Sequence, residues 1–144
     1  MGRLMDHAAG MEVTLHRAFD MARDPFAALD TAAELGCRTI LTSGQAQSAP
    51  EGIALLGELR RKAAGRITIM AGSGGKKENI RTIYEKTGIL AYHTTARRGA
   101  TDSGMVYRKE GVSMGLPSLS EYELWRTDPE EFRICAETVH TLAD

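Results

Sequence analysis

The 144-residue sequence has no long apolar run, no strong excess of charge and only two cysteines. A membrane-spanning helix needs roughly 20 consecutive apolar residues, so we expect no membrane span. The formal net charge of -1 argues against a nucleic-acid binder, because such domains usually carry a basic excess. Two cysteines are too few for a disulfide framework, and residues 1–20 lack the pattern of a secretory signal. These absences predict a cytoplasmic protein.

The sequence does contain a repeated unit, in which a short apolar or β-branched run is followed by a glycine- or serine-rich turn and an amphipathic helix. The repeat has a period of about 25 residues, and this spacing predicts βαβ units with a parallel sheet. The strands are expected at residues 13–18, 39–44, 67–71 and 90–94. A closed TIM (βα)8-barrel needs about 250 residues. The predicted fold is therefore α/β, a single domain of about four βα units that forms half of such a barrel.

Helix signals follow the strands. Asp24 and Pro25 are typical of an N-cap and a first helical position. Ser48 and Glu51 have the spacing of a capping box and predict the start of the second helix. The third helix is expected to stop near Gly88, because glycine is common directly after a helix.

Three further segments lie outside the repeat. Residues 1–10 have apolar side chains at helical spacing and are interpreted as the remnant of another helix. The irregular sequence of residues 100–123 indicates a long loop, and the apolar stripe of residues 128–142 indicates a terminal helix. The apolar stripe of that helix includes Cys135, which we interpret, like Cys37, as a small core residue.

Ligands of parallel α/β folds bind at the carboxyl ends of the strands. Strand parity turns Val13 and Leu15 toward the helices and His16 toward the opposite side. The same parity turns Tyr92 toward the helices and His93 away from them. Both imidazoles are therefore expected in one cleft, as an acid/base pair or as metal ligands. The alternative is that both histidines are satisfied by hydrogen bonds in the core.

Two other turns offer charged or anion-binding groups. The first strand is followed by Arg17 and Asp20, candidates for a charge clamp and a base. The glycine-rich turn is expected to open onto a helix N-terminus, which favours an anion, and barrels of this type often hold a phosphate after the last two strands. The alternative is a flexible turn with solvated charges. The predicted anion-binding residues are Gly72, Ser73, Gly74, Gly75 and Arg97.

An ordered set of motifs makes the sequence resemble one known family. The set runs through residues 13–20, 40–45, 69–74 and 78–80, then His93 with Ala96, Tyr107 with Arg108, and residues 112–115. Together these motifs resemble the CutC copper-homeostasis family over about residues 1–142. Gly75 departs from the family pattern, which usually has valine there, and Thr94 and Thr95 stand where serines are common.

The resemblance implies a cytoplasmic TIM barrel with a role in copper homeostasis or copper binding, of which this chain matches the C-terminal half. The proposed copper ligands of the family are cysteines in its first strands, and those strands have no counterpart here. Cys37 and Cys135 therefore inherit no such role. If copper binds this chain, His16 and His93 are the candidate ligands, since imidazole suits copper.

Three hypotheses follow. The first is a CutC-like protein of copper homeostasis with copper as a possible cofactor. The second is an enzyme acting on a small anionic, possibly phosphorylated substrate, with His16 or Asp20 as base, His93 as acid and Arg17 as clamp. The third is a fragment without independent function. An open half barrel leaves two apolar edges, at residues 13–18 and 90–94, so we expect a homodimer or higher oligomer that covers them.

Overall fold

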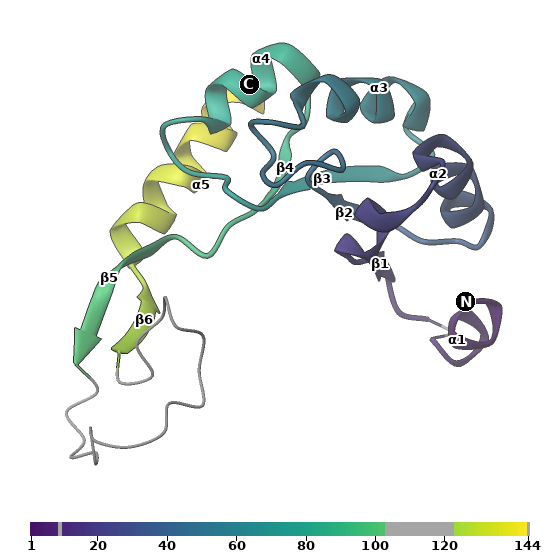
Figure 1. Cartoon of the computed structure of the whole chain (residues 1–144), viewed down its shortest axis with the longest axis horizontal. Coiled ribbons are helices and arrows are strands. Elements are labelled where there is room, and N and C mark those ends of the chain that lie inside the picture. Colours follow the sequence, from purple (N-terminus) through teal and green to yellow (C-terminus); the bar gives the residue numbers. More distant parts are fainter. Residues whose placement is uncertain (9, 103–122, 144) are drawn as a thin grey trace.

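The centre of the molecule is a four-stranded parallel sheet with the strand order β1-β2-β3-β4. A computed structural model describes residues 1–8, 10–102 and 123–143. The helices α2, α3 and α4 arch over one face of the sheet (Figure 1). The elements of the sheet and its cover are β1 (Thr14–Leu15), η1 (Arg17–Met21), α2 (Pro25–Glu34), β2 (Thr39–Thr42), α3 (Ile53–Ala63), β3 (Thr68–Gly72), α4 (Ile80–Thr87) and β4 (Ala91–His93). The predicted α/β class and its parallel βα units are confirmed.

Three elements flank this unit. The short helix α1 (Gly2–His7) precedes the sheet, and β5 (Arg97–Asp102) pairs antiparallel with β6 (Glu123–Thr127) after it. The helix α5 (Pro129–Ala143) then packs beside α4. No helix in the described ranges is long and apolar enough to cross a membrane.

The core lies between the sheet and the helices. Leu29 of α2, Leu56 of α3 and Ile83 of α4 are fully buried, and they pack in one cluster with Ile40 and Ile69 of the sheet. Burial of each such side chain contributes about 1.5–3 kcal/mol. Because the core draws on every βα unit, it fixes the carboxyl ends of all four strands relative to one another.

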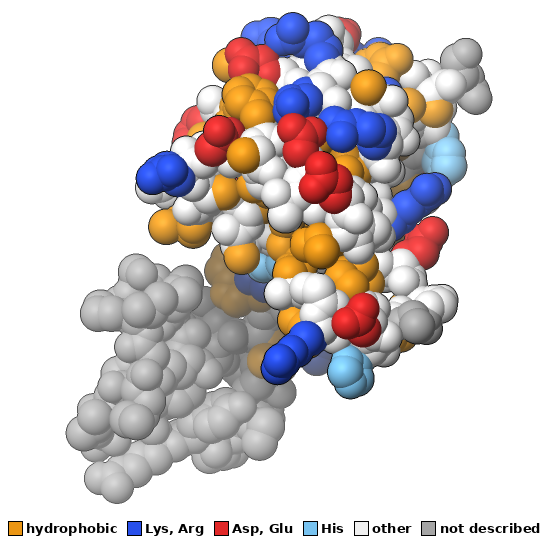
Figure 2. Space-filling model, turned by 90° about the vertical axis from the view of Figure 1, so that its right-hand side faces the viewer, with side chains coloured by type: hydrophobic (Ala, Val, Ile, Leu, Met, Phe, Trp, Pro, Cys, Tyr) orange, Lys and Arg blue, Asp and Glu red, His pale blue; other side chains and the backbone are white. Residues whose placement is uncertain are grey.

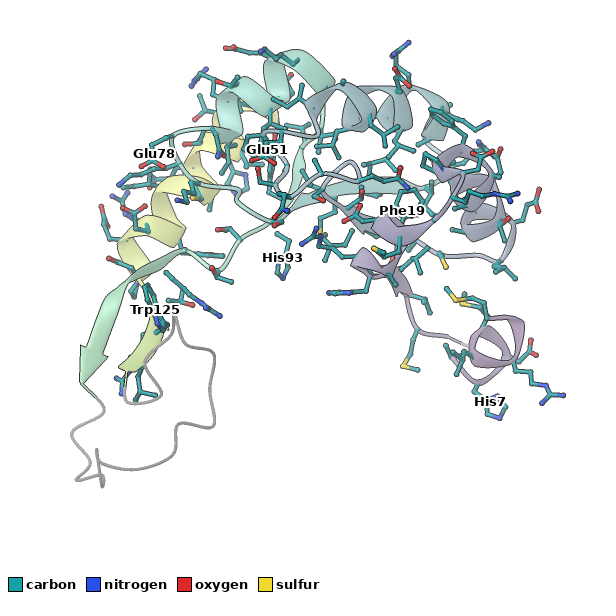
Figure 3. The ribbon with its side chains drawn as sticks, in the orientation of Figure 1. His7, Phe19, Glu51, Glu78, His93 and Trp125 are labelled. Atoms are coloured by element: carbon teal, nitrogen blue, oxygen red, sulfur yellow. The ribbon has the colours of Figure 1, made fainter. Side chains whose placement is uncertain are left out.

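The other face of the sheet, which we call the inner face, points away from the helices. Leu15 and Tyr92 pack against the core, as strand parity predicts. Parity therefore turns their neighbours His16 and His93 to the inner face, and both side chains are exposed. Figure 3 shows His93 projecting from the sheet away from the helices. The alternative of two histidines buried in the core is wrong.

Three strands are shorter than predicted, and the run 90–94 forms a strand only over β4. The run 13–18 forms only β1, because the chain turns into the 3-10 helix η1 directly after His16. The run 39–44 ends as a strand at Thr42, since Gly44 and Gln45 take positive φ angles of 72° and 57°. Each early end places a turn, rather than more strand, at the carboxyl edge of the sheet.

Two local expectations are also corrected. Ser48 and Glu51 do not form a capping box, because residues 48–52 make a turn and α3 begins at Ile53 after an N-cap at Gly52. The predicted loop 100–123 begins and ends in strand, since β5 and β6 lie at its two ends. The remainder of that segment, residues 103–122, lies outside the described residues.

Candidate anion-binding cleft

A cavity of about 680 Å³ lies at the carboxyl ends of the strands. Residues from the ends of β1, β3 and β4 line it, together with groups from β5, β6 and α5. Most of the residues that the sequence predicts for a site line this one cavity: His16, Arg17, Ser73, Gly74, Gly75, His93 and Arg97. Asp20 and Gly72 are not among its lining residues. Three segments that are distant in sequence, at residues 16–17, 73–75 and 93–97, are thus brought together.

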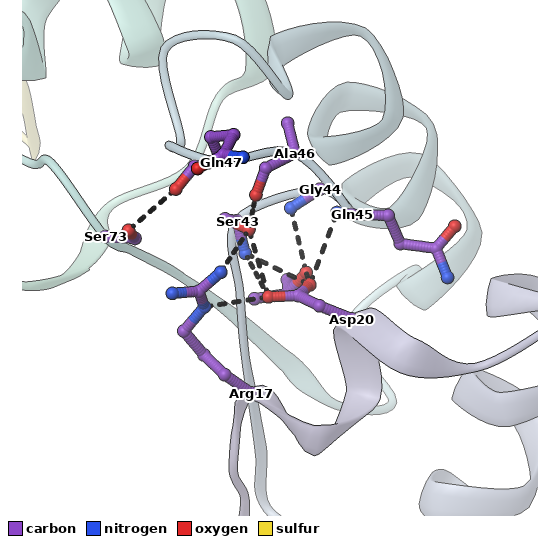
Figure 4. A network of polar contacts seen from close by, with 9 residues as sticks. Arg17, Asp20, Ser43, Gly44, Gln45, Ala46, Gln47 and Ser73 are labelled. Carbon is purple, nitrogen blue, oxygen red and sulfur yellow. Dashed lines mark hydrogen bonds and ion pairs between the residues drawn. The ribbon is translucent and has the colours of Figure 1, made fainter.

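Arg17 is the most firmly held cation of the cleft. Its Nε donates to Asp20 Oδ2 over 2.8 Å, and its Nη2 donates to Ser43 Oγ over 2.9 Å. Figure 4 shows the guanidinium fixed from one side by these two bonds. Among the described residues Nη1 has no partner. A guanidinium presents five N–H donors in a rigid fork, so Arg17 keeps donors for a ligand while its position is set.

The Asp20 carboxylate accepts the hydrogen bonds that hold together the turns after β1 and β2. Its carboxylate accepts hydrogen bonds from Thr42 Oγ1 over 2.5 Å, from the backbone N–H of Ser43 over 3.2 Å and from that of Gln45 over 3.3 Å, besides Arg17. Burial raises the pKa of Asp20, but the hydrogen bonds from Thr42, Arg17 and Ser43 together hold that pKa below its usual value. Every acceptor site of this anion is engaged, and its side chain is only 8% exposed.

The glycine-rich turn after β3 supplies backbone donors. Ser73 and Gly74 have positive φ angles of 69° and 83°, and within the described chain the backbone N–H groups of Gly74 and Gly75 donate no hydrogen bond. The expected helix N-terminus is not at this turn, because α4 begins only at Ile80. Asn79 instead braces the turn, accepting from the N–H of Lys76 over 2.9 Å and donating to the carbonyl of Gly74 over 2.8 Å.

The two histidines face the cleft without side-chain hydrogen bonds to the rest of the described chain. Within residues 1–8, 10–102 and 123–143, no group of three or more His, Cys, Asp or Glu side chains lies close enough to hold a metal ion. His16 and His93 therefore form at most part of a copper site. The donor set that they share with the cleft consists of cations and N–H groups, which suits an anion better.

The sequence reasoning missed the wall contributed by the C-terminal elements. Trp125 of β6, which is labelled in Figure 3, lines the cavity together with Glu131 and Cys135 of α5. An ion pair between Lys77 and Glu131 joins the turn after β3 to α5. Trp125 lies between the predicted loop 100–123 and the predicted helix 128–142, where no element was expected, although its apolar pair with Leu124 between charged residues is a strand-like signal. Cys135 is buried as predicted, but it also borders the cavity.

Comparison with known proteins agrees with this geometry. The sequence matches the CutC family over residues 1–98. The chain belongs to the CutC family. It is 48% identical over 134 residues to a CutC family protein of Parabacteroides distasonis, which covers 92% of this chain and 55% of that one. It is 44% identical over 131 residues to a human relative named copper homeostasis protein cutC homolog, covering 90% of this chain and 48% of the relative.

A solved structure of a CutC protein has a similar fold. The crystal structure of the CutC protein from Streptococcus agalactiae matches with a TM-score of 0.60 and 30% identity, over 63% of this chain and 45% of that one. The chain thus spans about half the length of the CutC relatives that it matches. The described sheet accordingly corresponds to half of a barrel, as the sequence predicts.

Proposed function

We propose that this CutC-family chain binds a small anionic ligand in the cleft at the carboxyl ends of its strands. The observation that carries the proposal is the fixed guanidinium of Arg17, which is anchored from behind by Asp20 and Ser43 and keeps Nη1 for a ligand. An anchored guanidinium loses little side-chain freedom on binding, so more of its interaction energy remains as affinity. The free N–H groups of Gly74 and Gly75 supply further donors to the same cavity.

The charged side chains that line the cavity favour a negatively charged ligand. Arg17, Lys76 and Arg97 line the cavity, against the carboxylates of Glu78 and Glu131. The Glu131 carboxylate is also engaged by Lys77. A phosphate or carboxylate group suits such donors, because both accept the planar pair of N–H bonds that a guanidinium offers.

In the enzyme form of this proposal, proton transfer belongs to His16 and His93. A neutral imidazole carries one nitrogen that donates a proton and one that accepts it, and both side chains are exposed to the cleft. We assign Asp20 the role of holding Arg17 rather than that of a base, because its carboxylate is occupied by five donors and its pKa is lowered. The clamp and the proton-transfer groups are thus different residues.

Phosphate titration by calorimetry tests the anion proposal. Inorganic phosphate is expected to bind the wild-type chain, and Arg17→Gln should weaken the affinity at least about tenfold, since a hydrogen bond to a charged group is worth about 1.5–3 kcal/mol. Arg23→Gln is the matched control, because Arg23 is exposed and lies outside the cavity lining. Equal dissociation constants for Arg17→Gln and the wild type would contradict the proposal.

The names of the relatives support a second function, in copper homeostasis. We propose that His16 and His93 contribute two imidazole ligands to copper. Copper titration should show weaker binding for the double variant His16→Ala/His93→Ala than for the wild type. Unchanged copper affinity in the double variant would contradict this copper site.

We also propose that the protein is located in the cytoplasm. Its cysteines at positions 37 and 135 are free, which fits a reducing compartment.

A further inference from the structure

The inner face of the sheet is covered only in part by the described residues, since Thr39 is 8% exposed. Thr14 and Thr68 lie in one row of the sheet with Thr39 between them, and both outer members of the row are exposed. Parallel sheets are normally covered on both faces, because their connections place helices there or the sheet closes on itself. The helices α2, α3 and α4 lie on the other face of this sheet (Figure 1).

Apolar side chains are exposed beside both edges of the sheet. Met11, three residues before β1, is 69% exposed. Leu90, directly before β4, is 41% exposed, and Phe132 of α5 is 53% exposed beside it. Leu90 and Phe132 border an apolar groove of about 240 Å³ between β4, α4 and α5. Figure 2, which faces the N-terminal side, shows hydrophobic side chains exposed among the charged ones.

We propose that a second copy of this chain covers the inner face and that two copies close into one eight-stranded barrel. The argument rests on strand direction. Since β1 and β4 are the two edges of one parallel sheet, a two-fold axis along the strands sets β1 of each copy beside β4 of the other, again in parallel. The resulting strand number is eight, for which the interior is filled by side chains. The relatives, in which this chain matches about half the length, support two such units per barrel.

The pairing also completes the cleft. All carboxyl ends of the paired sheets open at one end of the barrel, so His16 and Arg17 at the end of β1 approach the end of β4 in the partner copy. His93 and Arg97 stand at that end. Each half site is thus continued by residues from the other copy. The pairing itself uses the inner face and the edges, and it stands whether or not an anion binds.

Sedimentation velocity of the 144-residue chain at about 10 µM tests the proposal. The wild type should sediment as a species of about 31 kDa, twice the 15.7 kDa of the chain. Thr68→Lys puts a charge on the inner face and should give the monomer, because a closed barrel interior cannot solvate it. Thr82→Lys is the matched control, since Thr82 is an exposed threonine of α4, and it should leave the dimer intact. Far-UV circular dichroism checks that both variants fold.

Two results would overturn the barrel dimer. The first is a wild-type chain that sediments as a single species of about 16 kDa. The second is Thr68→Lys remaining dimeric, or Thr82→Lys becoming monomeric with it, because the interface would then lie elsewhere or depend on net charge alone.

Discussion

The carboxylate of Asp20 is the best point at which to test how the turns after β1 and β2 are held together. Replacing it as Asp20→Asn keeps the shape of the side chain but removes the charge and turns one acceptor oxygen into an N–H donor. The donors that now face this carboxylate come from Arg17, Thr42, Ser43 and Gln45. At least one of them loses its partner in the variant.

The cost can be worked from these contacts. A hydrogen bond to a charged group contributes about 1.5–3 kcal/mol, but bonds to one carboxylate are not additive. The side chain of Asp20 is 8% exposed, so water cannot fully replace the lost acceptor. We therefore expect Asp20→Asn to lower the free energy of unfolding by about 2–3 kcal/mol. At roughly 3 °C per kcal/mol for a chain of this size, the melting temperature should fall by about 6–9 °C.

The effect of Asp20→Asn should depend on pH with a definite sign. The pKa of Asp20 is lower in the folded chain than in the unfolded chain. The stabilisation is therefore fully present above the unfolded pKa of about 3.9 and is lost as the pH falls through the folded value. Urea unfolding at pH 7 should show the full difference between wild type and variant, and the difference should shrink as the pH falls below the unfolded pKa of about 3.9.

Asp6→Asn serves as the control, because Asp6 is exposed in α1 and has no hydrogen bond to the described residues. It should change the free energy of unfolding by less than about 0.5 kcal/mol. If Asp20→Asn stays within that range at pH 7, the network around Arg17 does not stabilise the fold, and the anchoring of the cleft must be reconsidered.

Two further predictions concern backbone packing and a buried phenol. Gly52→Ala should lower the free energy of unfolding by about 2 kcal/mol or more, because the new Cβ would collide with the carbonyl oxygen of Ser43. Gly57→Ala in α3 has room for the Cβ and should raise the free energy of unfolding by about 0.5–1 kcal/mol. Urea unfolding measures both changes. Burial, with the charge of Tyr84 beside it, raises the pKa of Tyr92 to about 12. Stability should be intact below pH 10 and fall as the pH rises toward 12, and Tyr92→Phe should flatten that fall; an unchanged pH profile in this variant would refute the assignment.

The repeat of strand and helix was readable in the sequence because it rests on local signals. Asp24 accepts hydrogen bonds from the N–H groups of Phe26 and Ala27, as an N-cap should, and Gly88 ends α4 with a φ of 70°. Strand parity also placed His16 and His93 on one face. Each of these features is decided by residues within a few positions of one another.

The conformations of the turns at the cleft could not be predicted from the sequence, because contacts between distant residues decide them. Asp20 bonds to Ser43 across 23 positions, and this tie bends the chain after β1 into η1 instead of continuing the strand. Gly52 allows the turn before α3 to touch the carbonyl of Ser43, which moves the start of that helix away from Ser48. The wall around Trp125 depends on a pairing of β5 with β6 whose strands are separated by residues 103–122.

The reactivity of the two buried cysteines reports local opening in two different parts of the fold. Cys37 belongs to the core under the sheet, while Cys135 is the buried residue of α5. A thiol reagent can reach either sulfur only when its surroundings open, so the labelling rate of each cysteine measures the opening of a different part of the fold. Faster labelling at Cys135 than at Cys37 would mean that α5 separates from α4 while the core stays closed. The cleft would then lose its α5 wall and regain it without unfolding of the chain.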